Sequence, residues 1–206
     1  MNNFLKSWLD KWNRIVVFAG VFDPVHKAHI SAAETALTLG KKVVFLPERV
    51  PQHKHSTTDY THRLNMLKIA TKSNPRFEVL DYPEDHQYIE PVFKWLKAKY
   101  PASSFVWIVG SDVAPLMAKW PGVENLESLG VKGVYYLNRH GSEIGNSYEL
   151  DNGVVLYQLK RRRNWKKHIT HSRINSASIR ENTKQNRDQL PGGVFEYLVA
   201  NGLYNN

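Results

Sequence analysis

Short apolar runs typical of strands alternate with amphipathic stretches typical of helices along most of the chain. The strand-like runs span residues 14–19, 42–47, 76–81 and 103–110, and the helical stretches between them span 28–39, 61–72 and 90–100. Strands of about five to eight residues separated by helices of about ten to thirteen predict βαβ units. We therefore expect an α/β fold, a Rossmann-like doubly wound parallel sheet with helices on both faces.

The rest of the chain extends this pattern. The predicted elements are strands at 131–139 and 153–160, a helix from Asn175 or Ser176 to about Asn186, and a last helix within 193–204. A length of 206 residues suits one domain. We predict a single domain over residues 14–206, preceded by an amphipathic helical extension over residues 1–13. This extension would pack on the body of the protein or on a second copy in a homo-oligomer, with a membrane-surface helix as the alternative.

Composition excludes several kinds of chemistry. The chain has no cysteine, which rules out disulfides, thiolate metal sites and cysteine nucleophiles. No apolar stretch reaches the roughly 18 residues of a transmembrane helix, and the N-terminus is unlike a signal peptide, which favours the cytoplasm. The formal net charge of +9 favours anionic partners such as nucleotides. The basic run over residues 160–168 is typical of a solvated loop, so we do not expect a nucleic-acid partner.

The turn after the first predicted strand carries the chemistry. Gly20 ends the strand, Asp23 and Pro24 form a turn, and His26 and His29 follow at the start of the next helix. A glycine at this point permits a sharp turn or a close approach of the backbone to a ligand. Two imidazoles three residues apart at a helix N-terminus lie beside free backbone N–H groups, which makes an anion site. The alternatives are a metal-binding pair, for which no clear third ligand is nearby, and two unrelated histidines.

Residues 20–30 resemble the G-x-F-D-P-x-H-x-G-H signature of the nucleotidyltransferase superfamily. More narrowly, they resemble that of the nicotinate or nicotinamide mononucleotide adenylyltransferases. Further segments resemble motifs of that family in the same order: PQHK at 51–54 with HRLNML at 62–67, GSDVAPLMAKW at 110–120, YLNRHG at 136–141, INSASIR at 174–180 and LPGGVFEYLVANGLY at 190–204. One motif alone is moderately specific, whereas the whole ordered set is a strong signal.

The resemblance implies adenylyl transfer from ATP to a pyridine mononucleotide in NAD biosynthesis, with pyrophosphate as the second product. The acceptor phosphate would attack the α-phosphorus of ATP directly, so no side chain would act as a nucleophile. Catalysis would then depend on positioning and charge stabilisation. Mg²⁺ would be carried on the ATP phosphates, without a carboxylate cage in the protein.

The resemblance also implies roles for particular residues. For ATP, Gly20, Val21 and Phe22 would present backbone groups, His26 and His29 would bind the phosphates, Gly110 and Asp112 the ribose, and Ser176, Ile179 and Arg180 the β- and γ-phosphates. For the acceptor, the residues would be Lys54, Ile89, Trp120 and Arg139. His26, His29 and Arg180 would be the catalytic residues. The plainer alternatives are that Asp112 caps a helix, that Trp120 lies in the core, and that Lys54 and Arg180 are solvated.

The chain departs from the family pattern at Ala28, Asn175 and Ala177, where the family has Gly, Ser and Thr. A methyl group at position 28 could crowd a phosphate, and the later changes remove at least one hydroxyl donor. Residues 84–96 match the family's acceptor-binding segment poorly, so a carboxylate and a carboxamide acceptor both stay open. The alternatives are a different phosphorylated acceptor and a nucleotide-binding paralogue with weakened catalysis.

Overall fold

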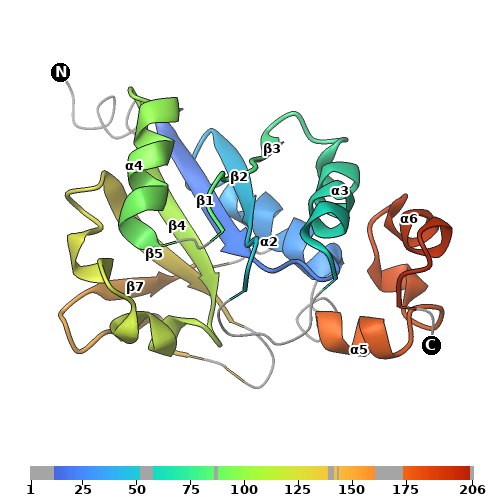
Figure 1. The fold of residues 1–206 in the computed structure, drawn as a ribbon. Helices are drawn as coiled ribbons and strands as arrows, with labels where there is room; N and C mark the ends of the chain where they lie inside the picture. Colours follow the sequence, from blue (N-terminus) through green and yellow to red (C-terminus); the bar gives the residue numbers. More distant parts are fainter. Residues whose placement is uncertain are drawn as a thin grey trace.

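The computed structural model describes residues 12–51, 58–85, 88–138, 142, 144–160 and 174–204. These residues form a seven-stranded sheet in the order β3-β2-β1-β4-β5-β7-β6 (Figure 1). Every neighbouring pair of strands is parallel except β6 and β7, which are antiparallel. The predicted doubly wound, mostly parallel sheet is therefore confirmed.

The strands are β1 (Arg14–Gly20), β2 (Lys42–Pro47), β3 (Phe77–Val79), β4 (Ser104–Gly110), β5 (Val131–Leu137), β6 (Ser147–Glu149) and β7 (Val155–Gln158). The α-helices are α2 (Lys27–Ala36), α3 (Tyr60–Thr71), α4 (Ile89–Lys99), α5 (Ser176–Glu181) and α6 (Val194–Ala200). The 3-10 helices are η1 (Ala114–Lys119), η2 (Val123–Asn125) and η4 (Arg187–Gln189). The first four strands are joined by α2, α3 and α4, as the alternating pattern predicts.

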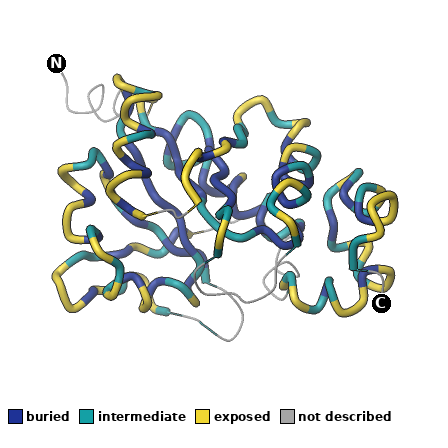
Figure 2. The backbone as a smooth tube through the Cα atoms, in the orientation of Figure 1, coloured by how far each residue is buried: buried dark blue, intermediate teal, exposed yellow. Residues whose placement is uncertain are grey.

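Alternate residues of β1 enter two different cores. Ile15 and Val17 pack with α4 on one face of the sheet, while Val16 and Phe18 pack with α2, α3, α5 and α6 on the other. Because both faces of the sheet are covered, its central strands are continuous apolar runs in the sequence. Figure 2 shows the result, with buried residues along the strands and inner helix turns and exposed residues on the outer loops.

The winding of the sheet reverses between β1 and β4. The chain passes from β1 through β2 to β3 at one edge, and α4 then carries it back to β4 on the other side of β1. β1 and β4 are paired up to Phe18 and Ile108. Gly20 and Gly110, which end these two strands, therefore lie next to each other at the carboxyl-terminal edge of the sheet. Loops that leave this edge in different directions form the usual ligand site of such sheets.

Some elements differ from those predicted. The strand expected at 76–81 is only the three-residue β3, because it lies at the edge of the sheet and pairs with β2 alone. The helix expected to reach Asn186 ends at Glu181. There the Asn182 backbone leaves the helical region (φ −149°, ψ 79°), and its side chain accepts the N–H of Gln185 at 3.1 Å. The sequence pattern does not predict β6 or the 3-10 helices, because such short elements have no readable period.

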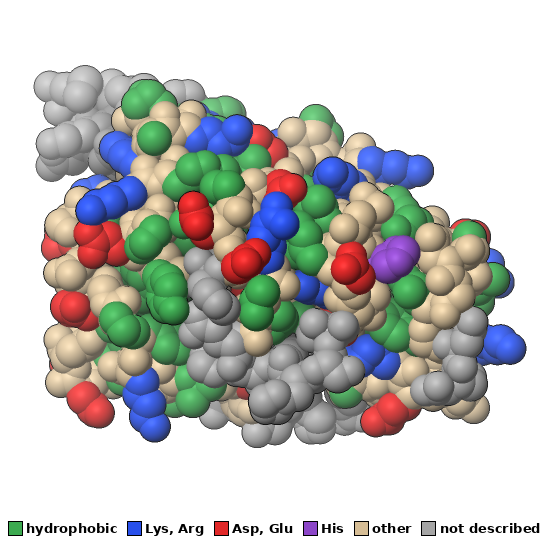
Figure 3. Space-filling model, viewed as in Figure 1, with side chains coloured by type: hydrophobic (Ala, Val, Ile, Leu, Met, Phe, Trp, Pro, Cys, Tyr) green, Lys and Arg blue, Asp and Glu red, His purple; other side chains and the backbone are tan. Residues whose placement is uncertain are grey.

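Two predicted segments lie almost entirely outside the described residues. Residues 1–11 of the helical extension and residues 161–168 of the basic run are not described, so both interpretations stay predictions. Within the described ranges, no helix is long and apolar enough to cross a membrane. On the face shown in Figure 3, the described Lys and Arg side chains are interspersed with Asp and Glu rather than gathered in one patch.

Candidate active site

The loop after β1, residues 20–26, is held by hydrogen bonds to its backbone carbonyl groups. The Gly20 carbonyl accepts the N–H of Glu48 at 3.0 Å, and the Val21 carbonyl accepts Nη1 of Arg63 at 2.9 Å. Both donors belong to the next βα unit of the chain. A loop whose carbonyl groups are satisfied by the protein is preorganised before a ligand binds.

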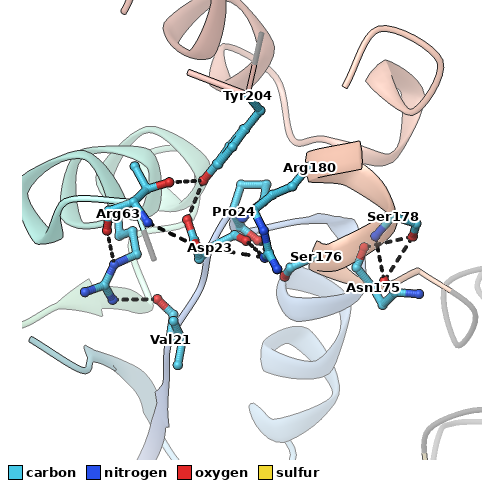
Figure 4. Close-up of polar contacts among 10 residues, drawn as sticks. Val21, Asp23, Pro24, Arg63, Asn175, Ser176, Ser178, Arg180 and Tyr204 are labelled. Carbon is cyan, nitrogen blue, oxygen red and sulfur yellow. Dashed lines mark hydrogen bonds and ion pairs between the residues drawn. The ribbon is translucent and has the colours of Figure 1, made fainter. Parts of the chain in front are cut away.

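Two more carbonyl groups of this loop are held by α5 (Figure 4). The Pro24 carbonyl accepts Oγ of Ser176 at 3.1 Å, and the Asp23 carbonyl accepts Nη1 of Arg180. Ser176 and Arg180 were both predicted to bind ATP phosphates. The structure therefore brings them to the same loop as the two predicted histidines, although about 150 residues separate them in sequence.

The sharp turn of the loop falls at Phe22 and not at Gly20. Phe22 has a φ of 53°, a left-handed conformation that costs a residue with a Cβ atom roughly 1–2 kcal/mol. Its ring centroid lies 5.3 Å from that of Phe18 and 5.0 Å from that of His29. A Cβ atom on Gly20 would lie 3.4 Å from the Phe22 ring. A side chain on Gly20 would therefore meet this ring at ordinary contact distance, and the left-handed residue of the loop is Phe22, so of the two roles expected of Gly20 only the close approach to a ligand stays a prediction.

The predicted histidines form one unit at the start of α2. His26 is the N-cap and His29 the third helical residue, and both are buried, at 2% and 7% exposed. The backbone N–H of His26 donates to Nδ1 of His29 at 3.2 Å, and the ring centroids are 3.7 Å apart. In a neutral imidazole whose Nδ1 accepts, the proton is on Nε2. His29 therefore has an Nε2–H donor beside the helix N-terminus, an arrangement suited to phosphate.

Arg63 in α3 is a buried guanidinium for which no role was predicted. It is 1% exposed and, besides the Val21 carbonyl, donates to the carbonyl groups of Glu48 (2.7 Å), Arg49 (2.9 Å) and Thr58 (2.9 Å). Burial lowers the pKa of Arg63, and the carbonyl groups replace the lost water. Arg63 thereby joins the loop after β1 to both ends of the loop after β2. Its place in the HRLNML segment was the only signal for it in the sequence.

Asp23 is a second site residue without a predicted role. It is 3% exposed, its Oδ1 accepts the Tyr204 hydroxyl, and its Oδ2 accepts the Thr58 N–H at 3.2 Å. The same Oδ2 lies 3.8 Å from Nη1 of Arg180. Burial, and then the bond to Asp23, raise the pKa of Tyr204 above its ordinary value. Figure 4 shows Arg180 of α5 and Tyr204 of the segment after α6 pointing toward Asp23, with Arg63 of α3 beside the loop.

Asn175, which stands where the family has Ser, is the N-cap of α5. Its Oδ1 accepts the backbone N–H of Ser178 at 2.9 Å and the Ser178 hydroxyl at 3.0 Å. Asn and Ser are equally good N-caps, so this replacement preserves the start of the helix. Ile179 is fully buried, and its N–H donates to the Asn175 carbonyl at 3.4 Å. In this structure Ile179 anchors α5 to the core.

The loop after β4 carries a second group of predicted residues. Gly110 ends β4 and Asp112 is exposed. η1 has Val113 as its N-cap, so Asp112 does not cap that helix. Trp120 ends η1, is half-buried, and lies with its ring centroid 5.9 Å from that of Trp107. These residues follow the strand that neighbours β1, on the same edge of the sheet as the histidines.

The predicted acceptor residues are only partly placed. Ile89 begins α4, is 6% exposed and packs in the core. Lys54 and Arg139 lie outside the described residues, so their roles stay predictions. Among the residues that are described, no group of three His, Asp or Glu side chains is placed to hold a metal ion.

Comparisons with known proteins identify the family of the chain and relate its fold to solved structures. Residues 17–182 match the family model described as cytidylyltransferase-like. The nicotinate-nucleotide adenylyltransferase of Bacillus subtilis (strain 168) is 30% identical over 205 residues, which cover 93% of this chain and 98% of that protein. Two solved structures of Plasmodium falciparum nicotinic acid mononucleotide adenylyltransferase, complexed with NaAD and with APC, give TM-scores of 0.72 and 0.69 at 18% identity. Each match covers 94% of this chain and 98% of the Plasmodium chain, so the two proteins share one fold.

Proposed function

The chain belongs to the cytidylyltransferase-like family, and on that premise we propose that it transfers the adenylyl group of ATP to nicotinate mononucleotide. The products are the dinucleotide and pyrophosphate, and the reaction is a step of NAD biosynthesis. The likeness to a bacterial nicotinate-nucleotide adenylyltransferase over nearly the whole chain is the observation that carries this proposal. We also infer that the enzyme acts in the cytoplasm, where ATP is available.

The reaction is a direct in-line displacement. An oxygen of the acceptor phosphate attacks the α-phosphorus of ATP and forms the new P–O bond. The bond from the α-phosphorus to the bridging oxygen breaks, and pyrophosphate leaves with the electron pair. Because the substrate phosphate is itself the nucleophile, the protein has to align the two phosphates and stabilise the developing charge.

His29 is the central group in this proposal. Its Nε2–H donates to the α-phosphate, and the bond from the His26 N–H to Nδ1 keeps the ring in the tautomer that can do so. His26 and the first turn of α2 bind the adjoining phosphate oxygens. The backbone of Gly20, Val21 and Phe22 approaches the nucleotide through its N–H groups, since the first two carbonyl groups are already occupied by Glu48 and Arg63.

Arg180 binds the β- and γ-phosphates, which become the leaving group, and Ser176 adds its backbone N–H at the start of α5, because its hydroxyl already donates to the Pro24 carbonyl. Both contact the loop after β1, so they sit next to the histidines. A guanidinium suits this task because it forms paired, charge-assisted hydrogen bonds with phosphate oxygens. We propose that Ile179 contributes by anchoring α5.

The loop after β4 holds the two ends of the substrates. The exposed carboxylate of Asp112, next to Gly110, accepts the two hydroxyl groups of the ATP ribose. Trp120 stacks on the pyridine ring, and Ile89, Lys54 and Arg139 complete the acceptor side. Mg²⁺ arrives with ATP, bound by its phosphates.

Pyrophosphate release tests the proposal. The chain is incubated with MgATP and either nicotinate or nicotinamide mononucleotide, with the His29→Asn variant as the background. We expect release with nicotinate mononucleotide and the matching dinucleotide by chromatography. Pyrophosphate release with nicotinamide mononucleotide alone would contradict the proposed acceptor. Release with neither mononucleotide would contradict the proposed function.

A further inference from the structure

One buried carboxylate, that of Asp23, accepts hydrogen bonds from two distant parts of the chain and lies near a cation from a third. Oδ1 accepts the hydroxyl of Tyr204, which lies 181 residues later. Oδ2 accepts the N–H of Thr58 at 3.2 Å and lies 3.8 Å from Nη1 of Arg180. Asp23 is 3% exposed, so water contributes little to stabilising its charge.

Tyr204 is oriented toward Asp23 by a second hydrogen bond. The Thr58 hydroxyl donates to Oη of Tyr204 at 2.9 Å, so the Tyr204 proton is directed to the Asp23 carboxylate. Donors to a buried carboxylate stabilise its charge, and each one that is lost leaves more of that charge to be satisfied by the nearest cation. At Asp23 that cation is Arg180.

With ATP bound as proposed above, Arg180 would lie between two anions, the Asp23 carboxylate and the phosphates. Its side chain is 33% exposed, and Nη1 already donates to the Asp23 carbonyl while staying 3.8 Å from Oδ2. Full contact with the carboxylate would use the same N–H groups that reach the ATP phosphates. We propose that Tyr204 is a positioning residue for ATP. By donating to Asp23, it limits the ion pair between Asp23 and Arg180 and keeps the guanidinium available to phosphate.

The inference rests on the proposed function only in taking ATP as the ligand. The first test measures the ATP dissociation constant by calorimetry, without acceptor, in the wild type and in Tyr204→Phe. We expect the constant to rise about tenfold, the effect of one charge-assisted hydrogen bond. In steady-state assays the ATP KM rises while kcat changes less than about threefold, because the reacting phosphates still meet His29.

Tyr100→Phe is the matched control. Tyr100 also donates to a carboxylate, Oε1 of Glu78 at 2.8 Å, but between β3 and the end of α4, away from the loop. Its removal is expected to lower thermal stability while leaving the ATP dissociation constant unchanged. An equal change of ATP affinity in both variants would mean that Tyr204 acts only through stability, and would overturn the proposal.

A double-mutant cycle tests whether Tyr204 acts through Arg180. In the Arg180→Ala background, Tyr204→Phe is expected to change the ATP dissociation constant by less than about twofold, because the residue it positions is gone. The same tenfold effect in both backgrounds would refute the proposal.

If the wild type released no pyrophosphate with a pyridine mononucleotide but the cycle gave the expected result, the proposed acceptor reaction would be wrong and the role of Tyr204 would stand. A wild type that bound no ATP would overturn both.

Discussion

The backbone N–H of His26 donates to Nδ1 of His29, so the helix start itself sets which nitrogen of His29 carries the proton. This is one half of a capping box, with an imidazole in the place usually held by Glu or Gln. The bond satisfies one of the N–H groups that every helix start leaves free. It also leaves Nε2 as the donor, which links the stability of α2 to the chemistry of the site.

Two substitutions separate these roles of His29. An Asn side chain can reproduce the acceptor at Nδ1 and a Gln side chain the donor at Nε2. We expect His29→Asn to unfold within about 1 kcal/mol of the wild type and to lose at least about a hundredfold in kcat. His29→Gln should retain more turnover than His29→Asn. Urea unfolding and initial rates measure the two effects, and equal turnover in both variants would contradict the assignment of the donor.

Arg63→Lys tests the buried guanidinium that joins two loops. Lysine cannot replace the bonds to four carbonyl groups in one plane, so the free energy of unfolding should fall by about 2–4 kcal/mol. Turnover should fall as well, because the Val21 carbonyl is released. The control is Arg76→Lys, since Arg76 also donates to three carbonyl groups but is exposed. It should cost less than about 1 kcal/mol, and similar losses in both variants would show that burial is not the cause.

Gly40→Ala should destabilise the fold without any link to catalysis. A Cβ atom at this position would lie 2.7 Å from the Arg14 carbonyl oxygen, so the backbone would have to move. We expect a loss of about 1–3 kcal/mol in urea unfolding. At Gly192 nothing lies within 4 Å of the same atom, and Gly192→Ala should leave stability unchanged or raise it by up to about 1 kcal/mol. Unchanged stability in Gly40→Ala would refute the steric argument.

The ionisation of Glu78 should make the free energy of unfolding depend on pH. Burial alone would raise the pKa of Glu78, but hydrogen bonds from Lys42 and Tyr100 outweigh it and hold the pKa below its usual value. The unfolded chain then binds the proton more readily than the folded chain. The stabilisation is therefore complete above the unfolded pKa of about 4.5 and is lost as the pH falls through the folded value. Urea unfolding from pH 6 to pH 3 should show a shallower fall in Glu78→Gln, and parallel curves would contradict this assignment.

Local patterns in the sequence account for much of this fold. β2 has the predicted bounds, and α2 and α3 lie within three residues of theirs. The pairing of His26 and His29 was also predictable, since both stand in one turn of chain. The donor to Nδ1 was not, because it depends on the backbone conformation of His26.

The contacts that the sequence could not predict join residues far apart in the chain. Arg63 and Val21 are 42 residues apart, and Tyr204 and Asp23 are 181 apart. Nothing in the spacing of such residues indicates that they meet, since only the completed sheet brings their loops to one edge. Neither an arginine within a predicted helix nor a tyrosine after the last helix stands out in a sequence as a site residue. The structure was needed to assign them a role.

The carbonyl groups that fix the loop after β1 are held by donors from two different stages of synthesis. Glu48 and Arg63 emerge from the ribosome soon after the loop, whereas Ser176 and Arg180 emerge after every strand of the sheet. Contacts with such large sequence separation form late in folding. A nascent chain that ends at β7 therefore still lacks two of the four donors to this loop, as well as the helices α5 and α6 that cover one face of its sheet. Adenylyl transfer would then begin only when translation has delivered α5, so that unfinished copies of the enzyme bind no ATP productively.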